Sequence, residues 1–148
     1  MRNVIIVGVD GSDCSKKALR WAAALAKPFD ADLEAVIYWQ MPPIVAGFGG
    51  AYLPETVDPS KDAEKALTET VDEVFGTDRP HMDLVVQEGD AARGLIKRSA
   101  DARMLVVGSR GHGGFASLLL GSVSAKCVEH GSCPVLVIHG DTPAPEIA

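Results

Sequence analysis

Short apolar runs alternate along the chain with segments in which apolar residues recur every three or four positions. The runs are nearly unbroken, as in NVIIVGV at the start, which is typical of parallel strands covered on both faces. The predicted strands are Asn3–Val9, Leu33–Trp39, Asp83–Gln87, Arg103–Val107 and Pro134–Ile138.

The segments between these strands have the apolar spacing of amphipathic helices, and residues that start or stop helices bound most of them. The first predicted helix is capped by Ser12 or Asp13 and ends at Pro28, and the second begins at Asp58–Pro59 and runs to Phe75, where Gly76 stops it. The third is capped by Asp90 and includes Ser99, and the last is Ser122–His130. Strands and helices that alternate in this way predict a doubly wound α/β fold.

The length of 148 residues fits a single domain, with a core over about residues 3–139. The stretch Gln40–Ser60 is rich in proline and glycine and is predicted to be a long irregular loop, which is usually a functional lid or a disordered segment. The tail over residues 140–148 is expected to be frayed.

Charge and composition exclude several classes of protein. The net charge of −6 argues against a general affinity for nucleic acid or anionic lipid, although local backbone dipoles can still bind a nucleotide. No apolar run approaches the roughly 18 residues of a membrane span, and the N-terminus does not look like a signal peptide. The odd count of 3 cysteines fits a reducing compartment, so a cytoplasmic location is expected.

A glycine pattern follows the fourth predicted strand. Gly108 and Gly111 form Gly-x-x-Gly, and after nine intervening residues Gly121 and Ser122 stand at the start of the last predicted helix. Glycines let backbone N–H groups approach an anion, and a helix N-terminus favours negative charge, so the pattern predicts a phosphate site. It matches neither the P-loop, which needs a Gly-Lys-Ser/Thr ending, nor the dinucleotide fingerprint Gly-x-Gly-x-x-Gly.

Three stretches resemble the ATP-binding subgroup of the universal stress protein family: VGVDGS near the start, EGDAARGLI in the middle and VVGSRGHGGFASLLLGSVSAKCVEHGSCPVLVI near the end. The resemblance extends from Asn3 to about His139. It implies a Rossmann-like, adenine nucleotide alpha hydrolase-like fold with a five-stranded parallel sheet in the order 3-2-1-4-5. It also implies ATP at the carboxyl edge of the sheet and, in most members, a dimer.

The resemblance assigns binding roles to particular residues. Those that match the phosphate and ribose loop are Gly108, Ser109, Arg110 and Gly111. Those that match the segment presenting N–H and hydroxyl groups to the β- and γ-phosphates are Gly121, Ser122, Val123 and Ser124. Those that match the ribose, metal and adenine side of the pocket are Gly8, Val9, Asp10, Tyr38 and Val107. Asp10 is the candidate ligand of a Mg²⁺ ion bound with ATP, and the backbone at Tyr38 is the candidate adenine contact.

Plainer interpretations of these residues stay open. The glycines can shape a strand exit, Asp10 can cap the first helix, and Ser122 and Ser124 can be helix caps. The spacing of Cys127, His130 and Cys133 permits a zinc site, but a place on the buried face of a helix is the preferred interpretation for Cys127. His112 is expected to be a solvated loop residue.

No catalytic constellation emerges from the residue patterns: there is no nucleophile elbow, no recognisable carboxylate pair and no lysine at the phosphate loop. The expected function is therefore that of an ATP-binding stress-response module rather than an enzyme. The alternative is a slow Mg²⁺-dependent ATPase that uses Asp10. The last strand, residues 134–138, is expected to pair across a two-fold axis in a homodimer.

Overall fold

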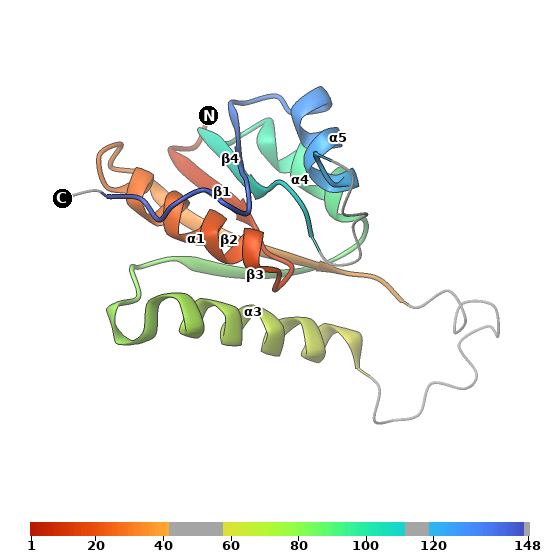
Figure 1. Cartoon of the computed structure of the whole chain (residues 1–148). Coiled ribbons are helices and arrows are strands. Elements are labelled where there is room, and N and C mark those ends of the chain that lie inside the picture. The colour runs from red at the N-terminus through yellow and green to blue at the C-terminus, as the bar shows by residue number, and fades with distance from the viewer. Residues whose placement is uncertain (42–57, 112–118, 147–148) are drawn as a thin grey trace.

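The computed structural model describes residues 1–41, 58–111 and 119–146 and contains a parallel five-stranded sheet (Figure 1). The strands are β1 (Val4–Gly8), β2 (Asp32–Trp39), β3 (Asp83–Glu88), β4 (Met104–Gly108) and β5 (Val135–Ile138). Their order in the sheet is β3-β2-β1-β4-β5, which confirms the predicted fold and strand order. The predicted strand bounds differ from the observed ones by a single residue at most ends.

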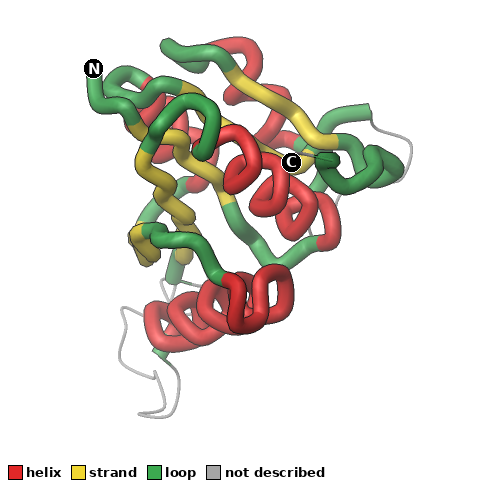
Figure 2. The backbone as a smooth tube through the Cα atoms, turned by 90° about the vertical axis from the view of Figure 1, so that its left-hand side faces the viewer, coloured by secondary structure: helices red, strands yellow, loops and turns green. Residues whose placement is uncertain are grey.

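All the predicted helices are present, and they pack on both faces of the sheet (Figures 1 and 2). They are α1 (Asp13–Ala26), α3 (Pro59–Phe75), α4 (Ala91–Ser99) and α5 (Ser122–His130), with a short 3-10 helix, η1 (Gly76–Asp78), after α3. The expected loop Gln40–Ser60 therefore ends before Pro59, and its residues 42–57 lie outside the described ranges.

The helix boundaries follow from their capping residues. Ser12 caps α1 by accepting a hydrogen bond from the Ser15 backbone N–H, and Asp58 and Asp90 cap α3 and α4 in the same way. Gly76 ends α3 with a positive φ of 57°, a conformation that favours glycine. Of the two caps considered for α1, Ser12 is thus the one used.

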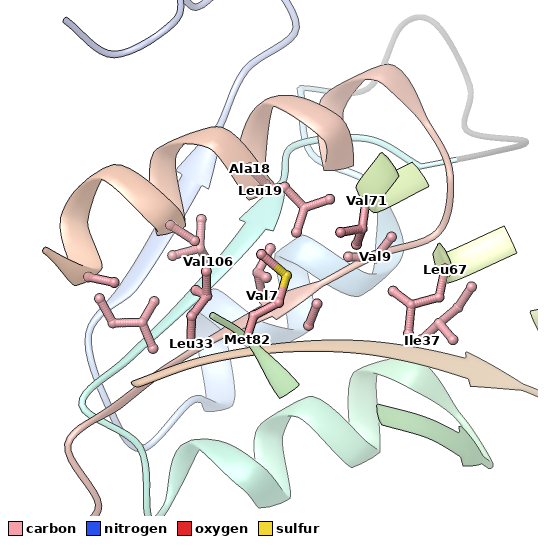
Figure 3. Packing of buried hydrophobic residues seen from close by; sticks show 14 of the residues in the cluster. Val7, Val9, Ala18, Leu19, Leu33, Ile37, Leu67, Val71, Met82 and Val106 are labelled. Atoms are coloured by element: carbon pink, nitrogen blue, oxygen red, sulfur yellow. The ribbon is translucent and has the colours of Figure 1, made fainter. Parts of the chain in front are cut away.

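The core has two parts because β1 is covered on both faces, and successive side chains of a strand point to opposite faces. Ile5 and Val7 of β1 pack under α1 and α3 with Leu19 and Leu67, in the cluster that Figure 3 shows from close by. Val4 and Ile6 of β1 pack under α4 and α5, with Leu95 and Cys127. The unbroken apolar run of β1 is explained by this burial on two sides.

One charged residue lies inside the sheet. Glu34 of β2 is 4% exposed, and its carboxylate pairs with Arg98 of α4 and, at 3.5 Å, with Arg2. Burying a carboxylate is costly unless it is paired with cations, which these two guanidinium groups provide. This ion pair joins α4 to β2 on the face of the sheet that α4 covers.

The C-terminal segment was expected to be frayed, but its residues Gly140 and Pro143 are bonded to α1. The Lys17 ammonium donates to the Gly140 carbonyl, and the Trp21 indole N–H donates to the Pro143 carbonyl at 3.2 Å. These bonds hold the segment against α1, and the sequence did not predict them because the tail has no periodic apolar pattern.

The topology fixes where a ligand site can form. β2 and β3 lie on one side of β1, and β4 and β5 lie on the other, so the direction of winding reverses between β1 and β4. In such sheets the carboxyl ends of the two central strands leave a crevice at this point.

Within the described ranges, no helix is long and apolar enough to cross a membrane.

Candidate functional site

A pocket opens at the crevice between the carboxyl ends of β1 and β4. Its space, including the open mouth, is about 820 Å³. The predicted site residues that line it are Gly8, Val9, Asp10, Tyr38, Val107, Gly108, Arg110, Gly111, Gly121, Ser122, Val123 and Ser124. The other described lining residues are Ser12, Ser15, Val36, Ala91 and Leu95. Segments far apart in the sequence thus converge on one pocket, as the resemblance implied.

Ser109 is the predicted site residue that is absent from the pocket lining. It is 1% exposed, and its carbonyl accepts hydrogen bonds from the Gly121 N–H at 2.6 Å and from the Ser124 hydroxyl at 2.8 Å. Ser109 therefore joins the two glycine segments instead of facing the cavity. The Ser124 hydroxyl proton is also used in this bond, so the group that Ser124 was expected to present to phosphate has a partner inside the protein.

The N-terminus of α5 faces the pocket. Gly121 is the N-cap residue of α5 and makes no side-chain capping bond, in contrast to Ser12, Asp58 and Asp90 at the other helices. The interpretation of Ser122 and Ser124 as caps is therefore wrong. The first N–H groups of a helix have no partner within the helix, and its dipole adds partial positive charge at this end. This end of the pocket suits an anion such as phosphate.

Asp10 connects the pocket to the start of α1. One carboxylate oxygen, Oδ1, accepts from the Ser12 N–H at 2.9 Å and from the Ser12 hydroxyl at 2.5 Å. Asp10 is therefore not the helix cap itself but holds the residue that is. The second oxygen, Oδ2, lies so close to Gly111 that a Cβ there would overlap it. Glycine at position 111 thus permits the loop after β4 to approach the carboxylate.

Apolar side chains line the end of the pocket beside β2, which lies across β1 from β4. Val36 and Tyr38 extend from β2 and Leu95 from α4. The Tyr38 hydroxyl accepts a hydrogen bond from Arg98 Nε at 3.1 Å. Burial raises the pKa of Tyr38, and Arg98 opposes this shift only in part. Tyr38 is thus a neutral phenol at physiological pH, and this end of the pocket suits a flat, uncharged group.

Comparison with known proteins identifies the family. The model of the Universal stress protein family matches residues 1–139. The chain belongs to the universal stress protein family. A universal stress protein of Mycolicibacterium smegmatis is 33% identical over 95% of this chain and 49% of its own length. Universal stress protein YxiE of Bacillus subtilis is 30% identical over 93% of this chain and 99% of its own. The chain spans about half the length of several of its curated relatives.

Solved structures of universal stress proteins have the same fold. UspA from Lactobacillus plantarum superposes with a TM-score of 0.70 at 23% identity, over 93% of this chain and 99% of that one. A universal stress protein in complex with cAMP superposes with a TM-score of 0.65 at 25% identity, over 95% of this chain and 98% of that one. The predicted family and fold are therefore confirmed.

Sequence reasoning missed some of the residues that line the pocket of this universal stress protein, although spacing could have indicated three of them. Val36 lies two positions before Tyr38 on β2, and side chains two apart on a strand share a face. Ala91 and Leu95 lie four positions apart on α4 and therefore share one face of the helix. Ser12 belongs to the motif VGVDGS at the end of the first strand but received no binding role, and nothing in the sequence pattern singles out Ser15.

The positions of Cys127 and His130 do not favour a zinc site at Cys127, His130 and Cys133. Cys127 is fully buried on the inner face of α5, as the preferred interpretation had it, whereas the His130 side chain is 61% exposed. Burial raises the pKa of the Cys127 thiol to about 11, which disfavours the thiolate that zinc requires. Among the described residues, no group of three or more His, Cys, Asp or Glu side chains is placed to hold a metal ion. His112 lies outside the described ranges.

Proposed function

We propose that this universal stress protein binds ATP in the pocket between β1 and β4. The observation that carries the proposal is the convergence of three separate segments, the end of β1, the end of β2 and the glycine pattern, on one pocket with an apolar end and an N–H-rich end. A nucleotide has the same division into an apolar base and anionic phosphates. The similar protein in complex with cAMP supports an adenine nucleotide as the ligand.

The polar end of the pocket would hold the phosphates. Hydrogen bonds to the phosphate oxygens would come from the N–H groups at the start of α5 and in the loop Gly108–Gly111. The base would lie against the ring of Tyr38 and the side chain of Leu95. Mg²⁺ is commonly held by one or two carboxylates together with substrate phosphates, so the single carboxylate of Asp10 fits this role. When bound, the ion would neutralise part of the phosphate charge.

The role we propose is that of a nucleotide-dependent binding module in a stress response. The described lining residues include no lysine, histidine or cysteine next to a serine that would form an activated nucleophile. A ligand that binds only the folded state stabilises it by mass action, and this is sufficient for a regulatory module. The alternative, a slow Mg²⁺-dependent ATPase, is favoured only by the position of Asp10 beside the phosphate end.

Release of the bound molecule tests the proposal most directly. Freshly purified protein is denatured, and the released small molecules are identified by mass spectrometry; near-stoichiometric ATP is the expected result. ATP added to emptied protein at 100 times its Kd should raise Tm by roughly 8 °C, since the stabilisation is about 2.7 kcal/mol. Released ADP that regenerates on incubation with ATP would favour the ATPase. Emptied protein that shows neither calorimetric heat nor a change in Tm with ATP would contradict both.

A homodimer through β5 is the second part of the proposed function. β5 is an edge strand, and Val135, Leu136 and Val137 are only partly buried within one chain. An apolar edge strand is a place for pairing with another chain. Light scattering at micromolar concentration should therefore give about twice the mass of 15.6 kDa. The mass of a single chain under these conditions would rule the dimer out.

A further inference from the structure

A second cavity lies next to the nucleotide pocket, and Tyr38 stands between them. This cavity is formed by the end of β3, the turn before α4 and one face of α4, including Gln87, Arg93 and Arg98. Among the described residues, Tyr38 alone lines both spaces. Its side chain is therefore the partition between the apolar end of the nucleotide pocket and a separate space whose wall includes the charged residues Arg93 and Arg98.

The ring of Tyr38 rests on a glycine of α4. A Cβ built on Gly94 would overlap Cε1, Cζ and the hydroxyl oxygen of Tyr38. Gly94 lies inside a helix, where glycine is among the least favourable residues and alanine is the most favourable. Room for the Tyr38 ring accounts for glycine at this position.

The hydroxyl of Tyr38 is anchored on the same helix. It accepts from Arg98 Nε at 3.1 Å, and the Arg98 guanidinium also pairs with the buried Glu34 carboxylate. Gly94 and Arg98 are four residues apart, so both lie on the face of α4 that meets β2. A turn of the ring away from this position would break the hydroxyl bond to an arginine that Glu34 already holds in place.

We propose that Tyr38 is a specificity-determining residue that closes the base end of the nucleotide pocket, with Gly94 and Arg98 as its positioning residues. The inference rests on the proposed binding of ATP. It implies that the pocket accepts an unsubstituted adenine and rejects a base carrying a bulky group that extends toward the second cavity. Loss of the ring would join the two spaces and admit such a group.

Calorimetry with substituted nucleotides tests the partition. The probes are ATP and three analogues with a benzyl-sized group on the exocyclic amine, at C2 or at C8 of the base. For at least one analogue, the ratio of its Kd to that of ATP should be about 100 in the wild type and should fall at least tenfold in Tyr38→Ala. Tyr38→Phe keeps the ring and should retain the wild-type ratio. Arg93→Ala is the matched control, because Arg93 lines the second cavity but not the nucleotide pocket, and it should also retain the wild-type ratio.

A double-mutant cycle tests the role of Gly94. Gly94→Ala should push the Tyr38 ring into the nucleotide pocket and weaken ATP binding about tenfold, whereas in the Tyr38→Ala background the same change should cost less than about twofold. Equal losses in both backgrounds, or equal analogue ratios in wild type and Tyr38→Ala, overturn the inference while leaving ATP binding intact. Wild-type protein that does not bind ATP overturns the proposed function and this inference with it.

Discussion

Gly111→Val is expected to lower the affinity for ATP at least about 100-fold, or about 2.7 kcal/mol, while the protein still folds. The structure gives a specific reason: even the Cβ of the new side chain would overlap Oδ2 of Asp10. Either the carboxylate or the loop must then move, and both line the proposed nucleotide site. Calorimetry with ATP and the circular dichroism melting curve of the variant measure the two parts of the prediction.

A second comparison separates displacement of Asp10 from direct blocking of the phosphates. If the valine acts by moving the carboxylate, the loss caused by Gly111→Val should largely disappear in an Asp10→Ala background. Gly121→Ala provides a graded reference, because its Cβ would meet Arg110 Cα and Ser109 O only at 3.4 Å, an ordinary contact. A folded Gly111→Val protein with an affinity within threefold of the wild type would show that the phosphate loop is misplaced.

Arg98→Met is expected to reduce the free energy of unfolding by about 3 kcal/mol. The Glu34 side chain is 5% exposed, and after this change the remaining cation among the described residues that pairs with its carboxylate would be Arg2, at 3.5 Å. A buried carboxylate that loses its main partner carries an uncompensated desolvation penalty, which is larger than the net value of the intact pair. Urea unfolding followed by circular dichroism measures the difference.

Two further variants identify the cause of that loss. Lys97→Met, at an exposed position next to Arg98 on α4, makes the same kind of substitution without uncovering a buried charge, so it should change stability by less than about 0.5 kcal/mol. Adding Glu34→Met to Arg98→Met removes the stranded carboxylate and should recover at least half of the lost stability. A single Arg98→Met variant as stable as the wild type would mean that solvent, and not Arg98, compensates Glu34.

The sequence predicted those features that depend on local pattern. The apolar run of β1 indicated a strand covered on both faces, and Asp58 and Asp90 marked helix starts because a side-chain oxygen must accept from the first N–H groups. The glycine pattern indicated the part of the pocket that we propose for the phosphates, because a helix start without a capping side chain leaves its first N–H groups for an anion. The order of the strands, in contrast, came from the family resemblance and not from the residues themselves.

Features that depend on contacts distant in the sequence were not predicted. Nothing in the pattern of β2 shows that Glu34 pairs with Arg98, which is 64 residues away. Ser109 was assigned by its position in the motif, but its backbone carbonyl is needed to bind Gly121 and Ser124, and this removes it from the pocket lining. A motif indicates which peptide segments meet, but it does not show which atoms of each residue face the cavity.

The two halves of the hydrophobic core have unequal freedom to change in evolution. The half under α1 and α3 shares only Val9 with the described lining of the pocket. The half under α4 and α5 supplies Val36, Leu95 and Val107 both to the core and to the pocket wall. Relatives can therefore exchange apolar residues under α1 and α3 without altering their ligand. The same exchange under α4 reshapes the pocket. Relatives that bind different ligands should therefore differ in the core residues on that side of the sheet.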